Sequence, residues 1–361
     1  MSGLPVLVDA QSLVAGVAGT GTATYARGLL GALAKVPDLS VRAVCGPGAS
    51  LPDGIGPVTV QRRSSRPRAL VMENALRLPL EVQRSRGPGS VFHNLSYHAV
   101  PGLRTPWVQT LHDVIPLAYP SPDLAALRSR WRRFAPRYRR ASAVIAVSRH
   151  AADEGIAHLG LRPDRVHVAP HGVDPAFRPG PGPQDPPYLL VVGEFGRRKG
   201  FAEAFAVIDA LAEEGLPHRL VVVGWDHGTG ALARLRASTR DPSRIELRSL
   251  VPDLVPLYQG AAALLMTSHY EGFGLPALEA MACGVPVVAY DNTALSEIAG
   301  PAASMVPDGD VAAMTAAVGQ ILRTPTLADE LRQRGLAHAS AFTWERSAAL
   351  HAEVYRSAAN R

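Results

Sequence analysis

The sequence contains little cysteine, no long apolar run and no leader-like start. Cys45 and Cys283 are the only cysteines among 361 residues, which is too few for a disulfide framework, and we expect both to be reduced thiols. No uninterrupted run of about 18 apolar residues is present, so no membrane-spanning helix is predicted. The first residues lack the basic region and long apolar stretch of a signal peptide. These absences favour a cytoplasmic protein.

Metal-binding patterns are also scarce. The single D-x-D in the chain is Asp308-Gly309-Asp310, within a turn signal, and a plain turn is favoured there over a metal site. His112 is not part of an H-x-x-x-H pattern, and no C-x-x-C accompanies it. We therefore expect neither a metal ion nor another cofactor.

Lysine is nearly absent although the chain is basic. The formal net charge is +6 and the pI about 9.6, yet of 37 basic residues only Lys35 and Lys199 are lysines. Such a skew usually reflects genomic base composition, and it makes a surviving lysine informative. Lys35 closes an amphipathic helix and is expected on the surface. Lys199 lies in a glycine-rich loop directly after a buried strand, which favours a functional role.

Strand-like apolar runs alternate with helical patterns along the whole chain, which predicts parallel sheets with crossover helices. Helices are predicted at 25–35 and 201–214. The predicted strands are 5–9, 41–45, 58–60, 90–92, 107–111, 143–147, 166–168, 188–192, 219–223, 245–247, 263–267, 286–289 and 303–305. Ser148 is a predicted helix N-cap. The fold class is α/β, with two doubly wound Rossmann-like domains facing a cleft at the carboxyl ends of their strands.

A proline-rich stretch divides the two halves. Residues 177–187 contain prolines and glycines that exclude a regular element, so we interpret them as a linker. The predicted domains lie at 1–176 and 188–340, and residues 341–361 follow the second one.

Two candidate loops follow strands of the first half. The stretch Val17 to Tyr25 resembles G-x-G-x-x-G, but Thr24 stands at the third glycine, so a dinucleotide fingerprint is disfavoured. A flexible loop around Gly21 and Thr22 that approaches a phosphate or sugar is favoured instead. His112 follows the strand 107–111, where a histidine can donate to a substrate hydroxyl or take a proton. The alternative is a histidine that only bonds its own loop.

Two further loops belong to the second half. In Gly193-Glu194-Phe195-Gly196-Arg197-Arg198-Lys199-Gly200, cations in a glycine-rich loop before a helix suit a diphosphate. The alternative is a solvated basic turn. In HYEGFGLPALEAMACGVPVV, Glu271 lies in a glycine-rich turn and Glu279 on a short helix whose N-terminus suits a phosphate. The alternative is an ordinary crossover with two exposed carboxylates. Carboxylates accept hydrogen bonds from sugar hydroxyls, so the two loops together predict a nucleotide-sugar site.

These residues resemble the retaining glycosyltransferases of the GT-B fold, in the E-x7-E group (family 4, group 1), over nearly the whole chain. Glu271 and Glu279 have seven residues between them. The resemblance implies catalytic roles for His112, Glu271, Arg198 and Lys199, the last two against the diphosphate. The implied donor-binding residues are Gly21, Thr22, Glu194, Val251, Phe273, Gly274, Leu275 and Glu279. The resemblance also implies that the domain at 1–176 is the acceptor side and that the domain at 188–340 binds the nucleotide sugar. A final helix within 341–361 is implied to pack back on the first domain.

Three positions depart from the pattern of that family. Ala23 stands where the first loop often has glycine, and His171 replaces the usual asparagine before Gly172. Glu194 occupies a position where relatives often carry a small or basic residue. A carboxylate there can touch the acceptor or the base, or oppose the diphosphate.

The resemblance implies transfer of a sugar from a nucleoside diphosphate donor to an acceptor hydroxyl, with retained anomeric configuration and no metal. The form of the His112 loop favours GDP-mannose. The acceptor class stays open among a glycan, a lipid-linked glycan and a metabolite. One rival is a nucleotide-sugar epimerase on the same fold, and the other is a basic nucleic-acid-binding protein.

An arginine-rich segment, RSRWRRFAPRYRR at residues 128–140, carries interleaved Trp131, Phe134 and Tyr138. Such a pattern suits anionic lipid headgroups or stacked bases. We favour peripheral contact with an anionic membrane, at the inner face of the cell membrane, over a solvated helix. Nucleic acid is not an expected partner.

Overall fold

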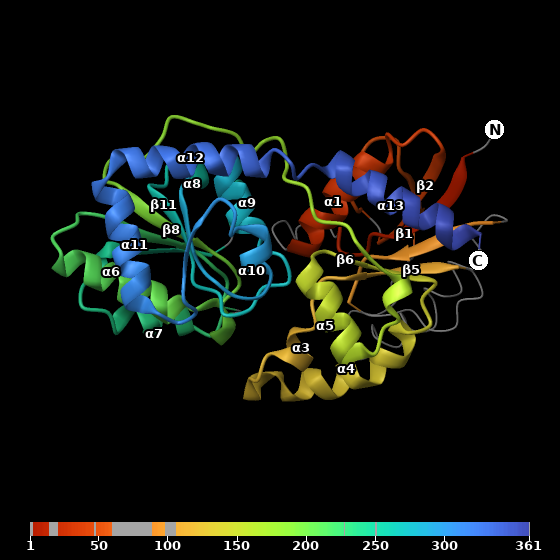
Figure 1. Cartoon of the computed structure of the whole chain (residues 1–361), viewed down its shortest axis with the longest axis horizontal. Coiled ribbons are helices and arrows are strands. Elements are labelled where there is room, and N and C mark those ends of the chain that lie inside the picture. Colours follow the sequence, from red (N-terminus) through yellow and green to blue (C-terminus); the bar gives the residue numbers. More distant parts are fainter. Residues whose placement is uncertain are drawn as a thin grey trace. The chain divides into compact units, whose positions relative to one another are not determined.

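The computed structural model describes residues 3–13, 21–46, 48–59, 89–97, 106–226, 228–249 and 251–360. It divides into two compact units (Figure 1). The first unit comprises Met1–Gly172 and Thr343–Arg361, and the second comprises Val173–Phe342. Each unit is an α/β body around its own parallel sheet, so the predicted fold class is confirmed.

The first unit is built on a seven-stranded sheet of order β3-β2-β1-β4-β5-β6-β7. Its strands are β1 (Leu4–Asp9), β2 (Leu39–Cys45), β3 (Gly56–Thr59), β4 (Val91–Asn94), β5 (Trp107–Leu111), β6 (Ala143–Ala146) and β7 (Val166–Val168). Its helices are α1 (Gly21–Leu33), α3 (Ile115–Ala118), α4 (Ala125–Tyr138), α5 (Arg149–Leu159) and α13 (Trp344–Ala359), with short 3-10 turns at Pro122–Leu124 and Pro163–Arg165.

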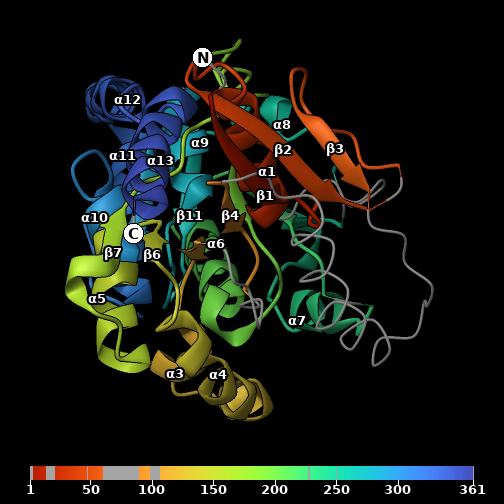
Figure 2. The same ribbon diagram turned by 90° about the vertical axis from the view of Figure 1, so that its right-hand side faces the viewer.

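Helices α1 and α13 share one apolar core with the central strands of this sheet. Gly28 of α1 is the point of closest approach, because a Cβ atom built on it would lie 2.1 Å from the indole of Trp344. The last helix of the chain is therefore an integral layer of the first unit, beside α1 (Figure 1; Figure 2). Helix α5 contacts β5, β6 and β7, and α4 contacts α3 and α5.

The start of α1 differs from the prediction. Gly21 and Thr22 form the first turn of the helix, whereas the sequence pattern assigned them to a loop ending at Thr24. Small residues without apolar periodicity hide this turn from a sequence reading, since the buried face of the helix only becomes continuous from Tyr25 onwards. Residues 14–20, the rest of the predicted loop, lie outside the described residues. The predicted N-cap Ser148 is confirmed, because its hydroxyl accepts a hydrogen bond from the Ala151 amide at 3.0 Å.

The second unit holds a six-stranded sheet of order β10-β9-β8-β11-β12-β13. Its strands are β8 (Tyr188–Val192), β9 (Arg219–Val223), β10 (Ile245–Arg248), β11 (Ala263–Met266), β12 (Val287–Tyr290) and β13 (Ser304–Val306). Its helices are α6 (Phe201–Glu213), α7 (Ala231–Ala237), α8 (Val255–Gln259), α9 (Leu275–Ala282), α10 (Thr293–Ile298), α11 (Val311–Arg323) and α12 (Pro325–Ala339), with 3-10 turns at Arg197–Lys199 and Pro242–Arg244. Helices α6, α7 and α11 supply one core of this sheet, while α9 contacts β11 and β12.

The proline-rich stretch 177–187 belongs to the second unit rather than standing between two domains. Its main chain is held by α8 and the residue after it: the Gln259 side chain donates to the Arg178 carbonyl at 2.8 Å, and the Gln184 amide donates to the Gly260 carbonyl at 3.0 Å. Phe177 packs edge-on against Tyr258. Proline blocks regular structure but not these contacts, so composition predicted the linker without its contacts to α8.

Helix α9 ends in a Schellman motif. Gly284 has a φ of 72°, its amide donates to the Met281 carbonyl, and the Val285 amide donates to the Ala280 carbonyl. Pro276 lies in the first turn of this helix, where its missing amide hydrogen costs nothing. Among the described residues no helix has the length and apolarity needed to cross a membrane.

The close contact between α1 and α13 generates a test of this packing. Gly28→Ala is expected to lower the free energy of unfolding by about 1–3 kcal/mol, because the new methyl group would overlap the buried Trp344 ring. The matched control is Gly31→Ala on the same helix, whose methyl group would meet Pro52 at an ordinary 3.8 Å. That control should stabilise by roughly 0.5–1 kcal/mol through helix propensity. Urea unfolding of both variants measures the difference, and equal shifts would refute the packing.

Candidate active site

The strand order of the second unit determines where its site lies. The chain runs outward from β8 through β9 to β10, and then returns to the other side of β8 with β11. At such a switch point the connections leave neighbouring strands in opposite directions, so a crevice opens at the carboxyl ends of the two strands. The loops after β8 and β11 carry Lys199 and Glu271, so these two predicted residues meet although 72 positions separate them.

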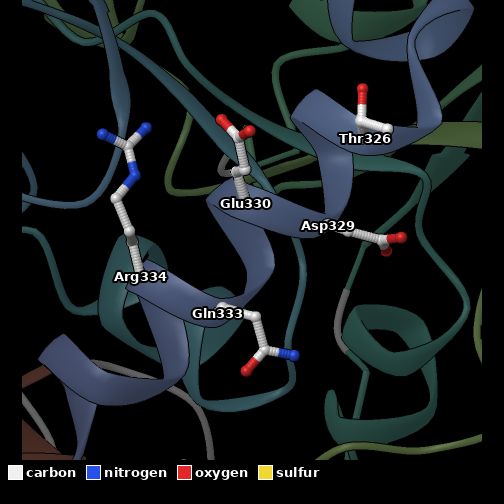
Figure 3. Close-up of a pocket in the computed structure, with 5 residues that line it drawn as sticks. All are labelled: Thr326, Asp329, Glu330, Gln333 and Arg334. Carbon is white, nitrogen blue, oxygen red and sulfur yellow. The ribbon is translucent and has the colours of Figure 1, made fainter.

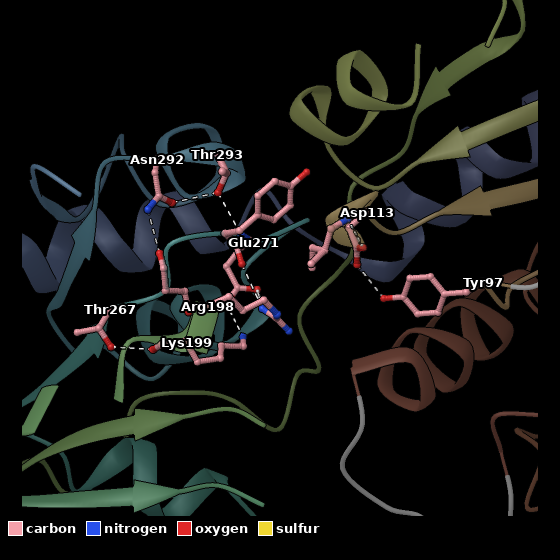
Figure 4. Close-up of polar contacts among 11 residues, drawn as sticks. Tyr97, Asp113, Arg198, Lys199, Thr267, Glu271, Asn292 and Thr293 are labelled. Atoms are coloured by element: carbon pink, nitrogen blue, oxygen red, sulfur yellow. Dashed lines mark hydrogen bonds and ion pairs between the residues drawn. The ribbon is translucent and has the colours of Figure 1, made fainter. Parts of the chain in front are cut away.

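An ion pair joins these two loops. Lys199 Nζ donates to Glu271 Oε1, and Arg198 Nη1 lies 3.5 Å from Glu271 Oε2 (Figure 4). The side chains of Lys199 and Glu271 are only 12% and 10% exposed. Arg198 also donates to the Tyr270 carbonyl at 3.1 Å. The structure thus brings three of the four predicted catalytic residues into one cluster.

The main chains of the two loops are bonded as well. The His269 amide donates to the Arg198 carbonyl at 2.7 Å, and the Thr267 hydroxyl donates to the Lys199 carbonyl at 3.0 Å. Gly200 has a φ of 61°, and a Cβ atom there would lie 2.0 Å from the Thr267 carbonyl oxygen. Only glycine fits this turn, which places Lys199 at the start of α6.

Burial and charge act against each other on this pair. Desolvation lowers the pKa of the Lys199 ammonium, although the neighbouring Glu271 carboxylate favours its charged form. Burial by itself would raise the pKa of Glu271, but the charges of Lys199 and Arg198 outweigh it, and the pKa of this carboxyl is lowered. The cluster therefore holds a carboxylate between two cations in a mostly buried setting.

Glu279 lies in a different environment on α9. It is buried, and the Tyr258 hydroxyl donates to its Oε2 at 2.8 Å. Desolvation raises the pKa of Glu279 to about 7, with the Tyr258 bond opposing and the charge of Asp174 adding to that shift. Gly274, with a φ of 103°, and Leu275 form the N-terminus of the same helix. The predicted alternative of two merely exposed carboxylates is wrong, because Glu271 and Glu279 are both buried.

Glu194, Phe273 and Val251, three further predicted donor-site residues, lie in loops of this unit, whereas Gly21 and Thr22 lie in α1 of the first unit. Glu194 is exposed and close enough to favour the charged form of Lys199. Phe273 is buried and its ring meets that of Phe342 edge-on. Val251 is half-buried in the loop between β10 and α8, and its donor contact stays a prediction.

His112 of the first unit follows β5 as predicted. Its Nε2 lies 2.8 Å from the Leu95 carbonyl, so Nε2 carries the proton and donates. Burial lowers its pKa, against the Leu95 bond and the charge of Asp113. Asp113 accepts a hydrogen bond from the Tyr97 hydroxyl at 2.9 Å and from the Ile115 amide at 3.0 Å (Figure 4). The ring is therefore neutral and fixed in one tautomer.

A buried polar network lies beside His112, and sequence reasoning missed it. The Tyr25 hydroxyl bonds Thr110 Oγ1 at 3.0 Å and His351 Nε2 at 2.9 Å, while the Tyr25 ring packs against the His112 ring. His93 joins Thr110 at 2.9 Å. Burial lowers the pKa of His351 to about 4 and that of His93 well below its usual value. Polar residues at buried helix and strand positions were the only available signal.

Three residues around Glu271 were also missed, namely His269, Asn292 and Thr293. The Thr293 hydroxyl accepts a hydrogen bond from the Glu271 amide at 3.1 Å, and the Asn292 side chain donates to the Ser268 carbonyl at 3.0 Å (Figure 4). Asn292 lies between β12 and α10, Thr293 is the first residue of α10, and β12 is the strand beside β11. Their place after a strand was a sequence signal, but their contact with Glu271 depends on strand order.

The arginine-rich segment forms α4 and the residues after it, and several of its side chains face inward. Trp131 is 7% exposed and Tyr138 only 1%. Arg128 donates to the carbonyls of Pro116 and Tyr119 at 2.9 and 3.2 Å. These two aromatic rings are therefore not available to stack on bases, which removes an observation that favoured nucleic acid.

Metal-binding geometry is not found in the part of the chain that the structure describes, where no three His, Cys, Asp or Glu side chains group to hold an ion. Asp308 instead accepts from His269 and Asn292, and Asp310 accepts from the Ala313 amide at 2.8 Å as the N-cap of α11. The need for a metal stays a matter for experiment. A shallow polar depression on α12 is lined by residues of that one helix (Figure 3). No other helix or strand of the described chain lines this depression, whereas the cluster around Lys199 joins two loops.

Two family models match the chain in succession. Residues 19–177 match "Glycosyltransferase Family 4", and residues 174–338 match "Glycosyl transferases group 1". The two matches meet near the end of the first unit and together span most of the chain.

Curated relatives with glycosyltransferase names match the chain, and a solved structure shares its fold. The chain is 36% identical over 225 residues to "D-inositol 3-phosphate glycosyltransferase" of Acidothermus cellulolyticus, covering 55% of this chain and 49% of the relative. It is 41% identical over 166 residues to "O-antigen chain mannosyltransferase B" of Escherichia coli, covering 44% and 42%. These matches span about half the length of the relatives. A sucrose-phosphate synthase structure from Thermosynechococcus elongatus has the same fold, with a TM-score of 0.78 at 21% identity over 98% of both chains.

Proposed function

The chain belongs to the group 1, family 4 glycosyltransferases of the GT-B fold, and we propose that it transfers a sugar from a nucleoside diphosphate sugar to an acceptor hydroxyl. One observation is the main support for this proposal. At the switch point between β8 and β11, Lys199 and Arg198 face Glu271, so cations for a diphosphate lie beside a carboxylate for sugar hydroxyls.

The reaction needs stabilisation of the leaving diphosphate, which gains negative charge as the glycosidic bond breaks. Lys199 and Arg198 supply fixed positive charge, and the N-terminus of α6 begins directly after Lys199. Glu271 favours the charged form of Lys199, against the effect of burial, and their ion pair orients the ammonium before the donor arrives. The Glu271 carboxylate accepts a hydrogen bond from a hydroxyl of the donor sugar.

Glu279 and the first turn of α9 complete the donor site in this proposal. Glu279 accepts hydrogen bonds from the ribose hydroxyls, in place of the bond from the Tyr258 hydroxyl or together with it. The amides of Phe273 to Leu275 face the sugar and phosphate. In the first unit, His112 is fixed as the Nε2–H tautomer and has an acceptor at Nδ1, and its catalytic role stays a prediction.

The finer parts of the proposal are retention of the anomeric configuration, independence of metal and GDP-mannose as donor. Electrostatic stabilisation by Lys199 and Arg198 supports metal independence. The mannosyltransferase relative supports the mannose donor. The acceptor is a hydroxyl of a glycan, a lipid-linked glycan or a metabolite.

A nucleotide-release assay tests the proposal. Purified protein is incubated with GDP-, UDP- and dTDP-sugars in the presence of EDTA, and free nucleoside diphosphate is measured. We expect slow hydrolytic release from one donor, GDP-mannose, and a loss of at least about 100-fold in Lys199→Ala, because a stabilising charge in the transition state is worth roughly 3 kcal/mol. Product analysis by NMR follows the fate of the sugar.

Each outcome of that assay decides something. A rearranged sugar nucleotide without release would identify an epimerase and refute the transferase. Activity that appears only without EDTA would refute metal independence. Silence across the panel, together with salt-sensitive binding of DNA, would support a nucleic-acid-binding protein instead.

Contact with an anionic membrane through α4 is a second part of the proposal. Leu127 is 42% exposed on this helix, and Arg132, Arg133, Arg139 and Arg140 are exposed on or just after it. An apolar side chain among exposed cations suits a lipid headgroup surface. The helix lies with α3 at one end of the first unit (Figure 2).

Vesicle sedimentation measures this contact. Neutralising Arg132 and Arg133 together to Gln is expected to weaken binding to vesicles of phosphatidylglycerol by about 30-fold, since each basic residue near the surface contributes about 1 kcal/mol. The control neutralises Arg234 and Arg240, two exposed arginines of the second unit, and should change binding little. Equal loss in both variants would show that net charge alone attracts the protein to the membrane.

A further inference from the structure

His269, two residues before Glu271, lies between two carboxylates. Its Nε2 is 3.0 Å from Glu203 Oε1 on α6, and its Nδ1 is 2.8 Å from Asp308 Oδ1 in the turn before α11. Ionised carboxylates only accept hydrogen bonds, so both ring nitrogens have to donate. A neutral imidazole has one N–H and can satisfy only one of these contacts, whereas the imidazolium satisfies both.

The charges around the ring favour that cation. Burial alone would lower the pKa of His269, but the hydrogen bonds and charges of Glu203 and Asp308 outweigh it, and the pKa is raised. Tyr290 of β12 stacks on the ring at a centroid distance of 5.6 Å. The contact between Arg198 and His269 is a main-chain hydrogen bond, in which the His269 amide donates to the Arg198 carbonyl.

A continuous chain of hydrogen bonds leads from this histidine to Glu271. Asp308 Oδ1 also accepts from Asn292 Nδ2 at 2.8 Å, and Asn292 Oδ1 accepts from the Thr293 hydroxyl at 3.0 Å. The Thr293 hydroxyl in turn accepts from the Glu271 amide at 3.1 Å (Figure 4).

Backbone strain at Thr293 indicates that the end of this chain is held in place by its surroundings. Thr293 has a φ of 42°, the only positive φ found for a residue other than glycine in the described part of the chain. A β-branched residue seldom adopts this conformation, and it persists only where neighbouring contacts fix it. Here the contacts are those to Asn292 and Glu271, which aim the Thr293 hydroxyl at the Glu271 amide.

We propose that the His269 imidazolium is a positioning residue of the donor site: it bridges Glu203 and Asp308 and, through Asn292 and Thr293, fixes the main chain that presents Glu271 to Lys199. This inference rests on the proposed function for its effect on turnover. The carboxylate of Glu271 has to stay between Lys199 and Arg198, and an error of a fraction of an ångström in its main chain is costly to catalysis.

The direction of the pH dependence follows from the titration of His269. Its pKa in the folded protein lies above the ordinary value of 6.5. The bridge is therefore complete at and below that value and is lost as the pH rises through the folded pKa, when one carboxylate loses its donor. The carboxyl groups that face the ring are those of Glu203 and Asp308. Donor turnover is thus expected to fall on the alkaline side.

The first arm of the test needs no substrate. In protein labelled with 15N-histidine and 15N-glutamate, the ring of His269, assigned by its loss in His269→Gln, should show mainly the imidazolium pattern at pH 6.5. The Glu271 amide, assigned by its loss in Glu271→Gln, should shift with the same midpoint. A neutral His269 ring at pH 6.5 would overturn the inference. So would a Glu271 amide whose chemical shift does not change as His269 titrates.

The second arm measures kcat/KM for the donor between pH 6 and 9. His269→Gln, which offers one donor group, should lower kcat/KM about 10-fold at pH 6.5, and the deficit should close as the pH rises. Glu203→Gln should move the alkaline limb of the profile to lower pH. The control His158→Gln removes a surface histidine paired with Glu154 and should leave the profile unchanged.

The two arms separate the failure of this inference from that of the proposed function. Parallel pH profiles for the wild type and His269→Gln would refute the positioning role while leaving the glycosyltransferase intact. Absence of turnover in the wild type would refute the proposed function, and the NMR titration would then still decide whether His269 controls the conformation at Glu271.

Discussion

The second unit depends on the meeting of the loops after β8 and β11, which the Lys199–Glu271 ion pair closes. Strand order brings the two loops together. Apart from the ion pair, the His269 amide bonds the Arg198 carbonyl, the Thr267 hydroxyl bonds the Lys199 carbonyl, and Gly200 lies against the Thr267 carbonyl. Because a buried charge without a partner is costly, each member of the pair needs the other. The donor site is therefore a consequence of topology as much as of side-chain chemistry.

Each unit has its own kind of buried polar cluster. In the second unit, Glu271 lies between Lys199 and Arg198, and the carboxylates of Glu203 and Asp308 flank His269 and favour its charged form. In the first unit, His93, His351 and His112 are buried among aromatic rings, and desolvation favours their neutral forms. The same residue type thus supplies a cation in one unit and uncharged hydrogen-bonding groups in the other.

Local patterns predicted the strands well, because buried parallel strands are short apolar runs between turn residues. The candidate residues Lys199 and Glu271 followed from a rare lysine and a glycine-rich turn. Contacts that depend on tertiary packing were not predictable in this way. Trp131 and Tyr138 seemed exposed among arginines but face inward, and the bridge through His269 joins three connections that only the folded sheet brings together.

The most direct test of the central claim is calorimetric titration of the preferred nucleoside diphosphate into matched lysine variants. Lys199 and Lys35 are the two lysines of the chain, and each is paired with a glutamate, one buried and one exposed. The account predicts that Lys199→Met weakens binding by about 10- to 100-fold, as expected for a lost charge-assisted hydrogen bond, while Lys35→Met binds as the wild type does. Equal affinity in both variants would contradict it.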